Sequence, residues 1–411
     1  MRPFRRALPQ SLPGTPVTTA ATDPIVASMS VEGLRRTPRG VLLTLIGVRP
    51  GQHLGSGDLL QASRRIEDFP TSTQSHLRSA PAAAGATALT AEVHERRLLP
   101  SGWIDLSSVI AHALITRTIR INVSAPFSYG DLWQPALRWP RARRLIGLDM
   151  SVPVPGGVRG LIRVETFRER QTYARPSDPS GQFEEVRQRF GASYADWVNG
   201  YLRLEGGAFA DHLDGEQYLA LKAVATTRLW RDHVATHVRI DRWFSPDTDE
   251  PGHYALDAAL DWRSTTADDQ PQWKVRTGAA MASADAPLAL WPGAGSNLDR
   301  TALLRARPLI KRNIVSGDVF GRRLAFASLE RQHPVWRSAR GAAAFAAFVD
   351  AGQAWDRLDD APDSRLEVDA GVGVRAGRPG DVSQLRLDVG IGLRDGRVRA
   401  SVGYVTVWGK Q

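Results

Sequence analysis

The most constraining feature of this sequence is a strict alternation of apolar and polar residues over long segments, clearest near its C-terminal end. The alternation runs through residues 365–375, breaks at the turn residues 377–380, and returns in residues 384–394 before the hairpin signal Asp395–Gly396. The apolar positions are Leu366, Val368, Ala370, Val372, Val374, Leu385, Leu387, Val389, Ile391 and Leu393. A period of two predicts strands of a sheet with one dry and one wet face.

Similar segments occur in the middle of the chain, at residues 158–165, 234–241 and 254–263. The longest segments extend over about 10–14 residues, whereas strands of globular proteins usually have about 5–6. Aromatic residues lie at the ends of several segments, among them Tyr254, Trp262 and Trp408, as in an aromatic girdle at a membrane interface. These features favour a transmembrane antiparallel β-barrel over the alternative, a soluble β-sandwich.

The length of the chain limits the number of strands. A membrane-spanning β-strand needs about 9–11 residues. The part of the 411-residue chain after residue 98 provides about 20 residues per strand and connection for 16 strands. We therefore predict about 16 strands, with residues 128–141 as a loop. The longest apolar stretches, Val41–Val48 and Gly341–Val349, are too short for a membrane-spanning helix, which needs about 20 residues.

The N-terminal quarter has a different texture. Residues 1–23 are rich in proline, threonine and alanine and predict a disordered lead-in. Residues 24–98 mix periods and predict a small α+β module in the order β-α-α-β-β. We expect a strand at Ile25–Val31, helices at Pro38–Ile46 and Asp58–Glu67, and a strand at Thr87–Glu95, with Ser56 as a helix cap. The barrel then occupies residues 99–411.

Composition and motifs exclude several classes of function. The chain has no cysteine, which rules out disulfides, iron–sulfur clusters and thiolate zinc sites. Its net charge of +10 comes from scattered basic residues, so we predict no nucleic-acid partner. Catalytic motifs are missing, and His233 and His237 would lie about 13 Å apart on a strand, too far for one metal ion. We predict that the protein is not an enzyme and that it has no catalytic residue, no cofactor and no metal.

The last third of the chain resembles a known family. The residues that carry this resemblance are Leu304–Leu309, Gly317–Asp318, Phe320–Arg322, Leu324–Pro334, Phe348–Gly352, Asp388–Gly390 and Leu393–Gly396. Their order is similar to the bacterial surface antigen superfamily of outer-membrane barrels, which includes barrel-assembly insertases, translocation-and-assembly barrels and two-partner-secretion transporters. Members carry periplasmic POTRA modules before a 16-stranded barrel. The resemblance implies that residues 24–98 are one POTRA-like module.

The resemblance also implies a lumenal site. In the family, a Val-Arg-Gly-Phe tetrapeptide lies at the tip of the sixth extracellular loop, which folds back into the barrel. The matching residues are Leu304, Arg305, Ala306 and Arg307, so the arginine is kept, glycine is replaced by alanine and the aromatic residue by arginine. The family's arginine meets acids on two inner strands, which match Glu330 and Asp350. Two carboxylates in a confined lumen favour an arginine as counter-ion. We expect Arg305 to bind them and Arg307 to matter much less.

The alternation and the final strand yield further expectations. Val368, Val372, Leu387, Ile391, Val402 and Tyr404 should face outward, and Glu367, Asp369, Arg386 and Asp388 should face the lumen. The last strand resembles the family's terminal assembly signal, carried here by Gly403, Tyr404 and Trp408.

The resemblance implies an outer-membrane protein that inserts or translocates polypeptide clients, with its module in the periplasm. Its other partners would be outer-membrane lipid and lipopolysaccharide, and periplasmic or assembly-machinery proteins. A passive pore with a basic lumen and a surface antigen or adhesin are the alternatives. No signal peptide is visible after the basic residues Arg2, Arg5 and Arg6, so we expect the true start to lie upstream.

Overall fold

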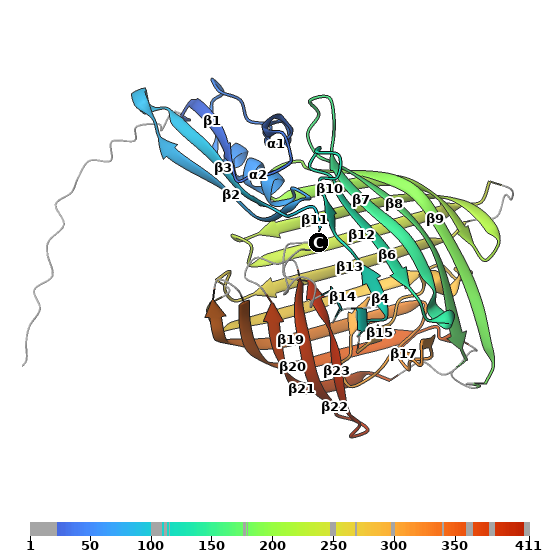
Figure 1. Cartoon of the computed structure of the whole chain (residues 1–411). Helices are drawn as coiled ribbons and strands as arrows, with labels where there is room; N and C mark the ends of the chain where they lie inside the picture. The colour runs from blue at the N-terminus through green and yellow to red at the C-terminus, as the bar shows by residue number, and fades with distance from the viewer. Residues whose placement is uncertain are drawn as a thin grey trace, which may run out of the picture.

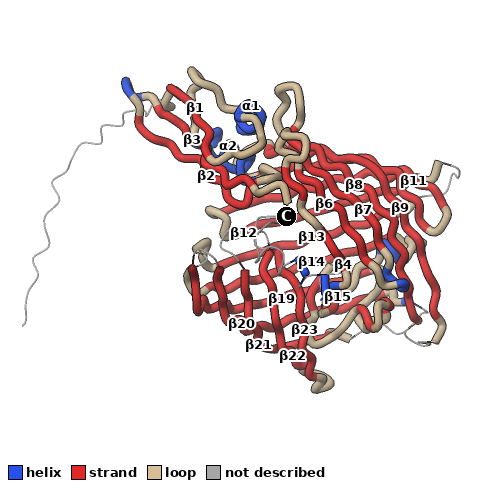
Figure 2. Tube along the Cα trace, in the orientation of Figure 1, coloured by secondary structure: helices blue, strands red, loops and turns tan. Residues whose placement is uncertain are grey.

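The computed structural model describes residues 23–99, 109–110, 113–114, 116–175, 178, 180–246, 252–267, 269–296, 301–338, 341–358, 365–377 and 383–406. A small N-terminal module lies at one end of a large ring of strands (Figure 1). Coloured by secondary structure, the chain is dominated by strands, with helices gathered mainly in the module (Figure 2). The predicted lead-in, residues 1–23, lies outside the described residues except for Asp23.

The N-terminal module follows the predicted order β-α-α-β-β. Its elements are β1 (Val26–Glu32), α1 (Arg39–Ile46), α2 (Ser56–Glu67), β2 (Ser72–Pro81) and β3 (Thr87–Glu95), with the 3-10 helix η1 (Ala83–Gly85) between the last two strands. The sheet has the order β1-β3-β2, with β1 parallel and β2 antiparallel to β3. Among the described residues, β1 and β2 form the sheet edges and no barrel strand pairs with them.

Local chemistry sets the limits of the two helices. Pro38 precedes α1 with a suitable φ of −61°, and Gly47 ends it in a left-handed conformation, φ 74°, where its N–H donates to the Leu43 carbonyl. Ser56 is the first residue of α2, so its prediction as a cap was wrong. The N-cap is Gly55, whose N–H donates to the Asp58 carboxylate at 3.2 Å, because glycine leaves the capping role to that side chain.

The barrel strands follow from residue 118 onward. They are β4 (Thr118–Arg120), β5 (Val123–Ser124), β6 (Leu132–Arg138), β7 (Leu145–Pro153), β8 (Leu161–Ala174), β9 (Gln182–Trp197), β10 (Leu202–Leu213), β11 (Glu216–Leu229), β12 (Val234–Phe244), β13 (Tyr254–Arg263), β14 (Gln272–Ala282), β19 (Arg323–Ser338), β20 (Gly341–Trp355), β21 (Glu367–Gly377), β22 (Ser383–Gly392) and β23 (Val398–Thr406). A 3-10 turn, η2 (Arg141–Arg143), separates β6 from β7.

These strands close into a barrel in which β23 neighbours β4. From β6 to β14 and from β19 to β23, each strand pairs antiparallel with the next, and β14 pairs directly with β19. Our prediction that residues 128–141 form a loop was wrong, because β6 pairs with β7 over its whole length. Pro135, which interrupts its pattern, lacks only an N–H, and its carbonyl still accepts a bond from Ile121.

The two faces of the last strands are those that the alternation predicts. Val372, Leu387 and Ile391 are 61 %, 45 % and 40 % exposed on the outside. The opposite face carries four buried charged residues, Glu367, Asp369, Arg386 and Asp388. Val368 and Val402 are half-buried, and the side chain of Tyr404 lies outside the described part. The inner face of these strands is therefore charged and can contact a segment that enters the barrel.

The segment between β14 and β19, residues 283–322, is here called the β14–β19 loop. It contains a 3-10 turn η3 (Leu288–Leu290) and four short strands, β15 (Ala294–Gly295), β16 (Ala302–Leu303), β17 (Ile310–Lys311) and β18 (Ile314–Val315). β15 and β16 pair with each other, and β18 pairs with the end of β8. The loop therefore reaches from its own strands to a strand on another part of the wall.

The N-terminal module is fastened to the barrel through α2 and the residues that follow it. Arg64 binds Asp232 in the β11–β12 turn, with one hydrogen bond of 2.9 Å, and Arg65 binds Asp196 near the end of β9 with two of 2.8 Å. Trp197, only 1 % exposed, donates its indole N–H to Asp68 at 3.0 Å. No helix among the described residues is long and apolar enough to cross a membrane.

Candidate functional site: arginines in the barrel lumen

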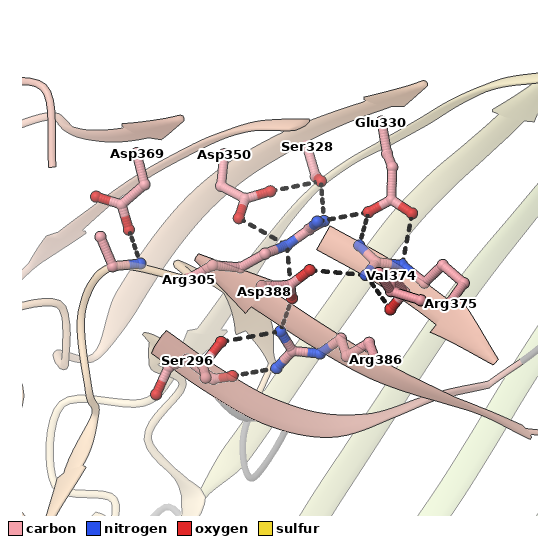
Figure 3. Close-up of polar contacts among 12 residues, drawn as sticks. Ser296, Arg305, Ser328, Glu330, Asp350, Asp369, Val374, Arg375, Arg386 and Asp388 are labelled. Atoms are coloured by element: carbon pink, nitrogen blue, oxygen red, sulfur yellow. Dashed lines mark hydrogen bonds and ion pairs between the residues drawn. The ribbon is translucent and has the colours of Figure 1, made fainter. Parts of the chain in front are cut away.

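Arg305 lies at the tip of the β14–β19 loop, inside the barrel, and is 2 % exposed. Its guanidinium is 2.5 Å from the Glu330 carboxylate of β19, and its Nε is 3.0 Å from an Asp350 oxygen of β20 (Figure 3). The guanidinium also lies over the Phe348 ring, 3.9 Å from its centre. Arg305 thus has two acids and an aromatic face as partners.

The register of β19 and β20 explains why these acids meet one arginine. Ser328 is directly opposite Asp350, and its hydroxyl donates to that carboxylate at 2.7 Å. Glu330 comes two residues after Ser328, so both side chains point to the same face of the sheet. The arginine therefore meets a surface already ordered by strand pairing.

Two further arginines of the wall extend this cluster. Arg375 on β21 donates to Glu330 with bonds of 2.9 and 2.6 Å and to Asp388 at 2.7 Å. Arg386 on β22 binds Asp388 and the Ser296 carbonyl of the loop (Figure 3). The sequence predicted that Arg386 faces the lumen, but it identified neither Arg375 nor Arg386 as a site residue. The only sequence signal for them is the alternation, which places both side chains on the inner face but does not predict their partners.

Arg307, two residues along the loop, is 4 % exposed and binds a different set of acids. It lies 2.8 Å from Glu367, 3.3 Å from Asp369 and 3.0 Å from Asp395. Burial acts to lower the pKa of Arg307, but the hydrogen bond to Asp395 and the three negative charges raise it overall. These contacts do not support our expectation that Arg307 matters much less than Arg305.

The other loop-tip residues shape the backbone. Leu304 is fully buried, in a cluster with Leu324 and Phe326 of β19. Ala306, in place of the family's glycine, is also buried, and its N–H donates to Asp369 at 2.8 Å. A methyl side chain is therefore accommodated at this position.

The remaining sequence predictions fall elsewhere. Gly403 lies in β23 and is buried beside Arg386. The Tyr404 side chain and Trp408 lie outside the described part, so the terminal signal stays a prediction. The Nδ1 of His233 donates to the Arg263 carbonyl at 2.9 Å, and His237 is near Thr226. Among the described residues, no group of three or more potential ligands could hold a metal ion.

The chain combines a closed antiparallel barrel, a loop whose buried arginine binds acids inside it, and a β-α-α-β-β module before the barrel. These features define a class of barrel proteins with an N-terminal module. By sequence, the chain matches no family profile and no curated protein. Solved structures do match it. BamA from Haemophilus ducreyi lacking POTRA domains 1–3 has a TM-score of 0.53 at 13 % identity, over 92 % of this chain and 84 % of that one.

Two further structures share the fold. CdiB from Escherichia coli has a TM-score of 0.58 at 12 % identity, over 93 % of this chain and 76 % of that one. CdiB from Acinetobacter baumannii has a TM-score of 0.55 at 12 % identity, over 93 % and 73 %. The chain therefore shares the fold of these BamA and CdiB barrels, which is the fold that the resemblance in the sequence implies.

Proposed function

We propose that this protein is a non-catalytic outer-membrane barrel that inserts or secretes polypeptides. The observation that carries the proposal is the β14–β19 loop, held inside the barrel by Arg305 on Glu330 and Asp350. This arrangement resembles the lumenal loop of the family's insertion and secretion barrels. An arginine that is ion-paired with two buried acids is suited to holding a loop in place.

The proposed location is the bacterial outer membrane, with the barrel spanning the bilayer. Exposed apolar residues cover the outer face of strands all around the ring, including Ile146, Leu221, Ile240, Leu329 and Val372. Charged groups lie on the inner face, which is the distribution that a bilayer requires of a spanning barrel. The lipid and lipopolysaccharide of that membrane are then direct partners.

The N-terminal module is proposed to be a POTRA-like receiver of clients in the periplasm. Its strand β2 offers an unpaired edge, and β-augmentation needs only backbone groups from an extended client. Residues Arg78 to Pro81 of this edge are largely exposed. The proposed client is therefore an unfolded polypeptide, and periplasmic or assembly-machinery proteins are further partners.

A photo-reactive residue in place of Ser79, on the β2 edge, tests this assignment in living Gram-negative cells. The matched control is Val158, which is 53 % exposed in the β7–β8 turn. We expect crosslinks from position 79, and not from position 158, to outer-membrane or secreted polypeptides identified by mass spectrometry. Equal crosslinking at both positions would contradict client capture by the edge.

Bilayer conductance separates this function from the alternative of a passive pore. The tip of the β14–β19 loop, with Arg305, lies in the lumen, so we expect a small conductance for the native protein and a larger one for Arg305→Ala. A large, steady conductance of the native protein would favour the pore.

A further inference from the structure

The loop tip carries two buried arginines, and they attach to different parts of the barrel wall. The close partners of Arg305 are Glu330 on β19 and Asp350 on β20, and Asp388 on β22 lies farther away, at 4.0 Å. Those of Arg307 are Glu367 and Asp369 on β21, and Asp395 in the turn between β22 and β23. Asp395 accepts hydrogen bonds of 3.0 and 3.2 Å from Arg307. The second arginine therefore reaches the last hairpin directly.

The backbone beside Arg307 is fitted to this attachment. Ala306 donates its N–H to Asp369, and the Arg307 carbonyl accepts from the Ser296 N–H at 2.6 Å. Gly390 on β22 faces the tip, and a Cβ there would lie 3.2 Å from the Ala306 nitrogen. A Cβ on Gly392 would lie 2.8 Å from the Arg307 guanidinium. Two glycines thus leave the space that the loop tip occupies against the last hairpin.

The buried carboxylates around Arg307 also depend on its positive charge. Glu367 and Asp369 are 2 % and 0 % exposed. The Glu367 oxygen nearest Arg307 and one Asp369 oxygen have no hydrogen-bond partner within the described part of the chain, so the arginine charge balances them by proximity. Arg394 also contacts Glu367, at 2.7 Å, but it is half-exposed. Loss of Arg307 would leave buried carboxylates with weak compensation.

From these contacts we infer that Arg307 is a positioning residue that couples the lumenal loop to the β22–β23 hairpin. Arg305 holds the loop on β19 and β20, whereas Arg307 sets the position of the last hairpin, whose strand β23 neighbours the first strand β4. This inference deepens the proposed function, since it assigns a second anchor to the same loop. It does not depend on the identity of a client.

Hydrogen–deuterium exchange of the full-length protein in nanodiscs tests the coupling. We expect Arg307→Ala to speed exchange in the 393–397 turn and the adjoining ends of β22 and β23 by about tenfold, while β19 and β20 stay as in the native protein. Arg305→Ala should show the opposite distribution. Arg312→Ala, at an exposed arginine in the β17–β18 turn of the same loop, is the control and should change neither region.

Two milder variants keep the test informative if Arg307→Ala does not fold. Asp395→Asn removes the charge that Arg307 meets in the hairpin and weakens the contact of Asp395 with Arg397 in the same turn, so exchange should rise in the turn and not at the loop tip. Arg397→Ala is the control for the second contact and should raise exchange in the turn less than Arg307→Ala does. Arg307→Lys should restore part of the protection because it keeps the charge without the planar fork. Unchanged exchange of the hairpin in Arg307→Ala or Asp395→Asn, or an equal rise in Arg312→Ala, would overturn the inference. A client assay that fails while these exchange patterns hold would count against the proposed function alone.

Discussion

Arg375 on β21 binds Glu330 on β19 through two hydrogen bonds of 2.9 and 2.6 Å, across the intervening strand β20. Glu330 is therefore shared by a wall arginine and by Arg305 of the loop. The Glu330 carboxylate thus links β19 to β21, which is not its neighbour, and to the β14–β19 loop. This shared acid makes the loop and the wall interdependent.

Replacement of Arg305 should weaken the barrel. Arg305→Ala leaves Glu330 and Asp350 buried without the loop charge, and loss of one partner of a buried pair costs about 3–5 kcal/mol. We expect unfolding on heating in detergent to begin at a lower temperature, as followed by gel mobility. Arg305→Lys should recover only part of the loss. Arg312→Ala is the control, and heat resistance equal to it in Arg305→Ala would refute the role of the pair.

Replacement of Glu330 should be as harmful as replacement of both of its arginines. Glu330→Gln removes the charge that Arg305 and Arg375 share. The effects of Arg305→Ala and Arg375→Ala should therefore be non-additive, with a coupling of about 0.5–3 kcal/mol. A double-mutant cycle on denaturant midpoints measures this coupling. Simple additivity would show that the two arginines act independently.

The pair Arg64–Asp232 is one of several contacts that attach the module to the barrel. Arg64 also donates to the Gly200 carbonyl at 3.3 Å and lies over Trp197. Arg64→Ala should loosen α2 on the barrel turns and speed proteolysis between module and barrel. Arg78→Ala, on an exposed pair of the same module, is the control. Cleavage at the native rate in Arg64→Ala would mean that the remaining contacts suffice.

Acid should loosen the module through Glu95. This buried carboxylate accepts hydrogen bonds from the N–H groups of Arg35, Arg36 and Thr37 and from the Thr37 hydroxyl. Burial alone raises the pKa of Glu95, but these bonds outweigh it and hold the pKa below its ordinary value of 4.5. The stabilisation is therefore present above the unfolded pKa and lost as pH falls through the folded one.

The measurement for Glu95 compares exchange of module amides across pH in the full-length protein. Glu95→Gln should destabilise the module at neutral pH by about 2 kcal/mol and should lessen the loss that the native protein shows as pH falls below the ordinary value of 4.5. Glu32→Gln, at an exposed end of β1, is the control. An identical acid response in the native protein and Glu95→Gln would exclude this group as the cause.

The outer face can be tested with a charge. Val372→Lys should cost about 2–4 kcal/mol if this side chain lies near the middle of a bilayer, because lysine loses its hydration there. Leu393→Lys, at an exposed residue beyond β22, should cost little. Folding yield into lipid vesicles measures both. Equal yields would place Val372 in water and contradict the membrane location.

Much of this architecture was predictable because its signals are local. The period-two pattern assigns each residue of β21 and β22 to a face, whatever the partner strand is. Gly47 ends α1 by its own backbone conformation, and the apolar spacing of α1 and α2 indicates two helices. The choice of Gly55 over Ser56 as a cap depended on one side chain, Asp58, three residues away.

The charged partners were not predictable from residues alone. The alternation predicts that Arg375, Glu367 and Asp369 point inward, but it says nothing about which groups lie opposite. Arg307 meets Asp395, 88 positions later, and Arg375 meets Glu330, 45 positions earlier. The match of Arg305 to Glu330 and Asp350 was expected only from the family resemblance.

The residue pattern alone was enough to predict most of the long strands, the two faces of the last ones and the order of the module's elements, because these depend on the nature of neighbouring residues. The folded chain was needed to show that β6 forms a strand through Pro135, that α2 docks on the barrel turns, and that Arg307 joins the last hairpin. The physical reason is that ion pairs and strand registers depend on distances between segments remote in the chain. Those distances are set only when the barrel closes and the loop enters it.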